Sequence, residues 1–144
     1  MNNMGSVWIM GIDPGQQSGC ALYNTATKQL VHLWTTDFWG AYEYVLNNRL
    51  VLIGVVVEVP DSKTVYHKPS TSLAATQRTA VNVGGVLREA QLLFDGIQKS
   101  GIPVQRVNPR GKVNAEKFKQ LTGWEGRSNN HERDAGMLTY RWRD

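Results

Sequence analysis

The 144-residue sequence predicts an α/β domain with a mixed five-stranded sheet, a meander for its first three strands, and helices on both faces. Three observations predict this class. The first half of the chain carries short apolar runs of strand length, and the second half carries apolar residues at helical spacing. Turns rich in proline, glycine and polar residues separate these runs. The length suits one domain, residues 1–144.

The first half of the chain is expected to supply four of the strands. Val7 to Ile12 is almost wholly apolar, as in a strand that is covered on both faces. It stops at Asp13-Pro14-Gly15, where proline and glycine favour a turn. Cys20, the single cysteine, excludes an internal disulfide and is expected to be buried in the next strand. The remaining segments are strands at 19–24, 29–35 and 50–59 and a short helix at 38–48.

In the second half, the apolar period changes from about two to 3.6 residues, which predicts amphipathic helices. One helical face combines Val83, Val86, Leu87, Ala90, Leu93, Phe94 and Ile97. A short strand is expected at 103–107. Asn114 can cap a helix that stops at Gly123, and Asn129 or Asn130 can cap a last helix that runs to about Trp142.

The sequence contains no pattern typical of a membrane or secreted protein, and its charges are unevenly distributed along the chain. No apolar run approaches the roughly 18 residues of a membrane span, and the N-terminus lacks the pattern of a secretory signal. We therefore expect a soluble, cytoplasmic protein. Residues 1–62 carry a net charge of −3 and residues 63–119 a net charge of +7. Such a division suits carboxylates that hold cations beside flanks that hold phosphates, although an ordinary solvated surface is the alternative.

Two carboxylates close predicted strands. Asp13 ends the first strand, and Glu58 ends the apolar run Val55-Val56-Val57. Ligands of open α/β sheets bind outside the carboxyl ends of the strands, so both side chains are expected at one site. A glutamate at the end of an apolar run is costly to desolvate unless a cation or a donor meets it. The alternatives are a structural role for Glu58 and a turn-forming role for Asp13.

His131 and Asp134 lie three residues apart near the start of the last helix, and therefore on one face. With the two strand-end carboxylates they form an oxygen-rich set with one imidazole, which suits Mg²⁺ or Mn²⁺ better than Zn²⁺. Taken alone, the pair is also compatible with helix capping. Glu132 and Arg133 are expected to point elsewhere and to be solvated.

The sequence contains no motif typical of nucleotide binding or of an activated nucleophile. The glycines after Asp13 do not form a Walker A loop, and no Gly-x-Gly-x-x-Gly occurs, so no nucleotide cofactor is expected. Ser18 and Cys20 have no neighbouring sequence that would activate a nucleophile.

These motifs resemble the RuvC family of Holliday-junction resolvases. The opening Gly-Ile-Asp-Pro-Gly-x-x-x-Gly, the strand that ends at Glu58, residues 79–85 before the central helix, the segment 115–117, and His131-x-x-Asp134-Ala135 occur in the family's order. The resemblance covers nearly the whole chain. It implies an RNase H-like fold, in agreement with the expected order of strands and helices.

The resemblance also implies a mechanism. It is two-metal hydrolysis of four-way or related branched DNA, leaving a 5′ phosphate and a 3′ hydroxyl. Two Mg²⁺ ions, replaceable by Mn²⁺, would be bridged by Asp13, with Glu58 on one ion and His131 and Asp134 on the other. Lys117, with Lys112 or Arg110 nearby, would offset charge that develops on the phosphate. The DNA-binding set would be Arg110, Lys112, Lys117 and Lys119.

The sequence departs from the family in ways that leave alternatives open. It is short, like phage-type members, and Val59-Pro60-Asp61 lacks the aromatic that relatives place after the second acidic residue; Tyr66 is a candidate substitute. These departures put strict junction specificity in question. An RNase H-like enzyme acting on RNA or RNA–DNA hybrids would have the same site. A non-catalytic DNA-binding module would not need the acidic set, and an actin-like ATPase would need two such domains.

A homodimer is expected, because a four-way junction presents two equivalent strands to be cut. The candidate surface is the helix from Ala80 to Lys99 together with Trp34, Trp39 and Tyr42. Completion of the core is the alternative role of these residues.

Overall fold

The computed structural model describes residues 7–60 and 73–144, and the side chains of residues 85 and 87–99 within the longest helix. The described elements follow the expected order of three strands, a helix, a strand, a helix, a strand and two helices. They are β1 (Trp8–Asp13), β2 (Ser18–Asn24), β3 (Gln29–Thr36), α1 (Phe38–Asn47), β4 (Leu52–Glu58), α2 (Leu73–Lys99), β5 (Val104–Val107), α3 (Ala115–Thr122) and α4 (Asn130–Thr139).

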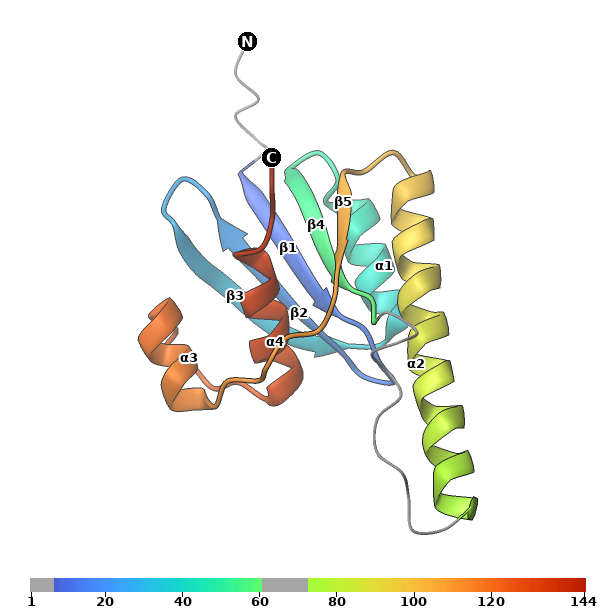
Figure 1. Ribbon diagram of the computed structural model, residues 1–144. Helices are drawn as coiled ribbons and strands as arrows, with labels where there is room; N and C mark the ends of the chain where they lie inside the picture. Colours follow the sequence, from blue (N-terminus) through green and yellow to red (C-terminus); the bar gives the residue numbers. More distant parts are fainter. Residues whose placement is uncertain (1–6, 61–72) are drawn as a thin grey trace.

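The five strands form one mixed sheet in the order β3-β2-β1-β4-β5 (Figure 1). β1, β2 and β3 are antiparallel neighbours, which confirms the predicted meander. β4 lies parallel to β1 and β5 lies parallel to β4. The parallel pairs need crossovers on a face of the sheet, and α1 and α2 provide them.

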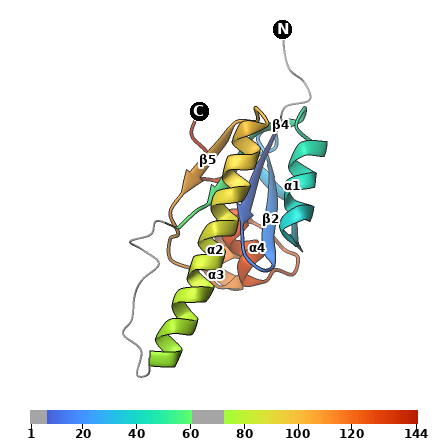
Figure 2. The same cartoon turned by 90° about the vertical axis from the view of Figure 1, so that its right-hand side faces the viewer.

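Helices cover both faces of the sheet, as the sequence predicts. α1 and α2 pack against each other on one face, and Figure 2 shows α2 running in front of the strands with α1 beside it. α4 packs on the opposite face across β1 and β2. The short α3 reaches this second layer through Phe118, which is buried with Ala21, Leu30 and Ala135.

Alternation along the strands decides which side chains face which layer. Met10 and Ile12 of β1, like Val55 and Val57 of β4, are buried toward α1 and α2. Ile9 and Val56 are buried with Leu138 on the α4 face. Asp13 and Glu58 have the same parity as Ile9 and Val56, so the alternation directs both carboxylates to the α4 face.

Two glycines let α4 lie close to the sheet. A Cβ atom on Gly11 would overlap with the carbonyl oxygen of Ala135, and a Cβ atom on Gly19 would overlap with the carbonyl oxygen of His131. Both obstacles are helix backbone, which cannot swing aside as a long side chain can. The absence of a side chain at these two positions therefore sets the distance between α4 and the sheet.

Two helix boundaries differ from the sequence-based expectation. α2 begins at Leu73, several residues before the predicted start at Ala80. α4 ends at Thr139 and does not reach Trp142. Tertiary contacts explain the early end: Trp142 lies against Gly54 of β4, and the side-chain amide of Gln105 pairs with the backbone of Arg143. These contacts hold the last residues against the sheet in a non-helical path.

The other capping predictions are confirmed. The side chain of Asn114 accepts a hydrogen bond from the amide of Lys117, and Gly123 ends α3 in the left-handed conformation. Asn129, one of the two candidates, caps α4. Cys20 is fully buried in β2. Tyr66, the candidate junction aromatic, lies outside the described residues. No helix in the described part of the chain is long and apolar enough to cross a membrane.

Candidate metal centre

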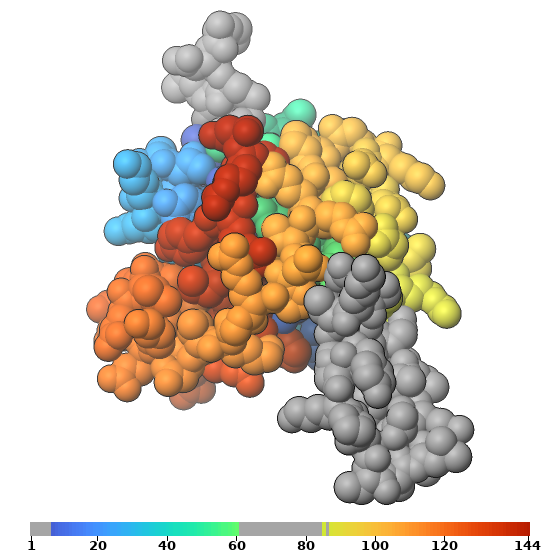
Figure 3. Space-filling model, in the orientation of Figure 1, coloured from blue at the N-terminus to red at the C-terminus, as the bar shows by residue number. Residues whose placement is uncertain are grey.

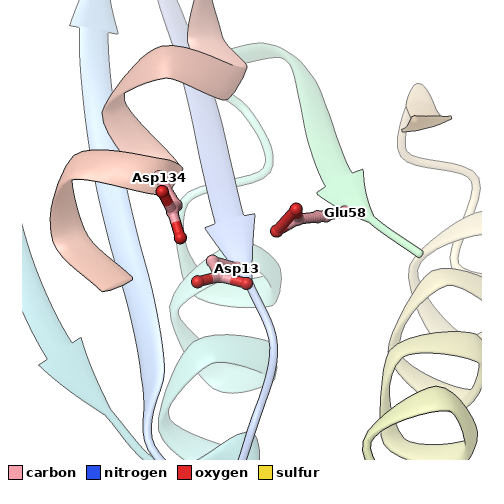
Figure 4. A group of neighbouring side chains, drawn as sticks. All are labelled: Asp13, Glu58 and Asp134. Carbon is pink, nitrogen blue, oxygen red and sulfur yellow. The ribbon is translucent and has the colours of Figure 1, made fainter. Parts of the chain in front are cut away.

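Three carboxylates from three separate elements converge at the carboxyl ends of β1 and β4. They belong to Asp13, Glu58 and Asp134, and one oxygen atom of each lies within 4.8 Å of the other two. Figure 4 shows Asp13 and Glu58 at the tips of their strands, with Asp134 reaching toward them from α4. The sequence-based prediction placed these three residues at one site, and the structure brings them together.

The strand pairing explains why the two strand-end residues meet. β1 and β4 are parallel, with Gly11 opposite Val56 and Ile12 opposite Val57. Continuing this register by one residue places Asp13 beside Glu58. Their shared parity sends both side chains to the α4 face, where the first turns of α4 carry Asp134.

Burial and mutual repulsion shift the titration of two of the carboxyl groups. Burial raises the pKa of Asp13 to about 6, although its hydrogen bond with Glu58 acts in the opposite direction. Burial, followed by the hydrogen bond and the negative charge of Asp13, raises the pKa of Glu58 to about 8. Near neutral pH the pair therefore holds a proton between two carboxyl groups that would otherwise repel each other.

Lys112 is the cation that contacts the cluster directly. Its Nζ lies 2.7 Å from Oδ2 of Asp134, and this contact raises the pKa of the lysine. The sequence-based interpretation gave the main role to Lys117. Lys117 instead lies at an exposed position of α3 and forms no ion pair with these carboxylates within the described residues. The lysine that contacts the carboxylates thus comes from the segment before α3, and the role of Lys117 at a bound phosphate stays a prediction.

His131 lies beside Asp13 but outside the converging group. Its Nδ1 is 3.1 Å from Oδ2 of Asp13, and about half of its side chain is exposed. The predicted set of four is thus, in the structure, three carboxylates and an adjacent imidazole that is hydrogen-bonded to one of them.

The residues between His131 and Asp134 are not solvated, contrary to expectation. A carboxylate oxygen of Glu132 accepts a hydrogen bond from the hydroxyl of Thr35 at 2.8 Å, and the other accepts the amide of Asn129 in a capping box. Arg133 is buried, with only 9% of its surface exposed. Its guanidinium donates to the carbonyl oxygens of Val113 and Ser128.

These contacts fix the first turn of α4, because Glu132 ties it to β3 and Arg133 ties it to the loops on either side of α3. The buried donors of Arg133 are all satisfied by hydrogen bonds, without an ion pair. Periodicity alone does not reveal such partners, since they come from loops distant in the sequence.

Next to the carboxylates, a groove of about 200 Å³ runs along α4. Glu58 and Asp134 are part of its lining, together with three arginines: Arg110, Arg141 and Arg143. Sequence reasoning singled out Arg110 as a DNA-binding residue but missed the other two. The signal available was their density, two arginines within three residues, which does not by itself indicate a site. Lys119 lies at an exposed position on α3, away from this groove lining.

The donor set fits a divalent cation with a preference for oxygen ligands. Three carboxylates offer hard donors at mutual distances short enough to share one or two ions, and no sulfur ligand is present. Burial raises the pKa values of Asp13 and Glu58, and a bound cation would favour their deprotonated forms.

Comparisons with known proteins support the fold. No family model matches the chain, and no curated protein matches its sequence. Among solved structures, the chain is similar to RuvC of T. thermophilus in complex with a Holliday-junction substrate. The TM-score is 0.57 at 16% sequence identity, over 92% of this chain and 90% of that chain. At this identity the similarity shows the RNase H-like α/β fold and its arrangement of strands and helices.

Proposed function

We propose that the protein is a metal-dependent endonuclease that cuts four-way junctions or related branched DNA. The observation that carries this proposal is the convergence of Asp13, Glu58 and Asp134 at the carboxyl ends of β1 and β4, beneath α4. The fold similar to that of a junction-bound RuvC gives this arrangement its context. Lys112 contacts one of the three carboxylates and His131 another, and a group of three carboxylates this close together is otherwise a costly arrangement.

In this proposal Asp13, Glu58 and Asp134 hold two Mg²⁺ ions, and His131 joins them as predicted from the sequence. Bound there, the ions would activate water and offset charge on the leaving 3′ oxygen, so that the products carry a 5′ phosphate and a 3′ hydroxyl. Mn²⁺ would substitute, because it accepts the same donors.

The chain's own residues contribute orientation and charge. Asp13 is held by its strand end and by its contact with His131, so its carboxylate is presented in a fixed direction. Glu132 and Arg133 lock the turn of α4 that carries Asp134. Lys112, 66% exposed in its side chain, can leave Asp134 and bind a substrate phosphate without disturbing packed structure. Lys117 and Lys119 of α3 are proposed as more distant contacts to DNA.

The test is cleavage of a synthetic four-way junction, a flapped duplex, a linear duplex and an RNA–DNA hybrid of matched sequence, with Mg²⁺ and with EDTA. We expect cleavage of the branched substrates in Mg²⁺ and no cleavage in EDTA. Cleavage restricted to the hybrid would replace the proposal with an RNase H-like activity at the same site. Binding without cleavage of any substrate would favour a non-catalytic DNA-binding module.

We further propose that the protein acts as a homodimer through the surface formed by α1 and α2. Trp39 supports this proposal because 64% of it is exposed, and it packs edge-on against Phe38 and Tyr42 at the start of α1. Leu92 of α2 is also exposed, at 56%. Trp34 instead packs between His32 and Tyr44. Sedimentation with and without a junction tests the assembly, and a monomer under both conditions would contradict it.

A further inference from the structure

The C-terminal residues form part of the lining of the groove beside the carboxylates, and contacts with other segments hold them in place. Figure 3 shows these residues, in red, lying on the surface against the orange segment that follows β5. Trp142 lies over Gly54, and the side-chain amide of Gln105 both donates to the carbonyl of Arg143 and accepts its amide. The backbone on both sides of Trp142 is therefore held in place, although it belongs to no helix or strand.

Three guanidinium groups line this groove, and their hydrogen bonds go to backbone carbonyl groups and not to carboxylates of the described residues. Arg141 donates to the carbonyl of Asn108 at 2.7 Å, and Arg143 to that of Trp142 at 3.3 Å. Within the described part of the chain, neither these two residues nor Arg110 forms an ion pair. Burial and the positive charge of Arg110 lower the pKa of Arg141, although the negative charge of Glu58 acts in the opposite direction. Three positive charges in one groove repel one another, and a further anion that binds among them would relieve this repulsion.

The position of the arginines indicates which anion fits. Glu58 and Asp134 line the same groove, so a chain of phosphates that entered it would lead directly to the carboxylates. Val113, Met137 and Leu138 provide apolar surface between the charges, which suits the sugars that join phosphates. Arginine also binds phosphate oxygens in a bidentate manner, and several such groups in one groove match a repeating anion better than a single one.

We propose that Arg110, Arg141 and Arg143 bind consecutive phosphates of a nucleic-acid strand and lead it along α4 to the carboxylate cluster. The inference rests on the proposed function for the identity of its ligand and adds the path of the strand. It extends the interface predicted from the sequence, which included Arg110, to the residues that follow α4.

The experiment compares the double variant Arg141→Gln/Arg143→Gln with the control Lys28→Gln/Arg49→Gln. The control loses the same charge from two exposed residues that do not line the groove. Binding of a fluorescent four-way junction and of the linear duplex is measured by anisotropy as salt is varied, with Ca²⁺ at fixed concentration. We expect the groove variant to lower the slope of log affinity against log salt by about 1.8, at roughly 0.9 for each lost contact.

The variant Arg141→Lys/Arg143→Lys separates charge from structure. It should restore most of the slope, because counterion release depends on charge. A slope for the glutamine variant equal to that of the control would overturn the inference, as would failure of the unmodified chain to bind DNA at low salt.

Calorimetric titration with Mn²⁺ distinguishes this inference from the proposed function. The glutamine variant should bind the metal as the unmodified chain does, since the carboxylates are unchanged. A chain that binds no metal but shows the expected loss of slope would refute the metal-dependent nuclease and leave the phosphate-binding groove standing.

Discussion

The two faces of the sheet are built from the same strands but serve different ends. Toward α1 and α2, β1 and β4 present Met10, Ile12, Val55 and Val57, all fully buried in one apolar cluster. Toward α4 the same strands bury Ile9 and Val56, but they carry Gly11 where the helix approaches and Asp13 and Glu58 at the strand ends. One face supplies burial of apolar surface, and the other supplies close approach and charge.

Residues that stabilise the fold and residues that carry chemistry therefore occupy alternate positions of the same strand. Side chains on the α1 and α2 face contribute by removing apolar area from water, about 25 cal/mol for each Å². The α4 face gives up part of that gain, because glycine offers little area to bury and a buried carboxylate is costly. Substitutions on the two faces should therefore have different signatures.

The largest effect is expected for the carboxylates themselves. Asp13→Asn, Glu58→Gln and Asp134→Asn should each reduce junction cleavage by more than the roughly 100-fold that loss of an outer-shell partner costs, because each removes a proposed metal ligand. Single-turnover cleavage with Mg²⁺ measures it, and DNA binding by the same variants should persist. Glu43→Gln on the exposed surface of α1 is the matched control. Activity within tenfold of the unmodified chain in any of the three would refute the assigned site.

His131 should matter less than the carboxylates. It contacts Asp13 from outside the converging group, and loss of a group that orients a ligand costs roughly 10- to 100-fold in metal affinity or activity. His131→Ala measured beside Asp13→Asn in the same cleavage assay ranks the two. An equal loss in both variants would show instead that His131 is an indispensable ligand.

The close approach of α4 gives the sharpest contrast between faces. Gly11→Ala places a methyl group against the backbone of Ala135, which should cost about 1–3 kcal/mol of unfolding free energy and displace Asp134. Val57→Ala on the other face should cost about 2 kcal/mol by leaving a cavity. Urea unfolding and Mn²⁺ calorimetry measure both properties. We expect metal affinity to fall in Gly11→Ala only, and unchanged affinity there would contradict the packing argument.

The smallest expected effect is a dependence of stability on pH that arises from the α4 face. The folded pKa values of Asp13 and Glu58, about 6 and about 8, lie above the ordinary values of these carboxyl groups. The folded state then binds more protons than the unfolded state, so stability falls as pH rises from about 4 toward 8. Glu58→Gln should remove part of this loss, on the order of 1–2 kcal/mol at pH 8 after screening.

Thermal unfolding of the metal-free protein across this pH range tests the expectation. Addition of Mg²⁺ should reverse the loss, because the ion binds the deprotonated carboxylates. Glu43→Gln is again the control. A Glu58→Gln variant that is less stable than the unmodified chain at pH 8 would show that Glu58 is a structural residue.

The order of the elements and the position of two of the carboxylates at strand ends could be predicted from local features of the sequence. Asp13 and Glu58 could be assigned to strand ends because the apolar runs before them end at polar or turn-forming residues, and strand ends of parallel pairs share one edge of a sheet. The caps at Asn114 and Asn129 were predictable for a related reason, since a cap satisfies amides within its own first turn.

The cations and partners that reach the site depend on contacts between segments that are distant in the sequence. Lys112 contacts Asp134 where Lys117 does not, and Arg133 is buried by carbonyl oxygens from loops on either side of α3. Arg141 and Arg143 join the groove because Trp142 is fixed over Gly54, more than eighty residues away in the chain. Long side chains reach targets that no local period encodes, so their partners depend on how distant segments pack.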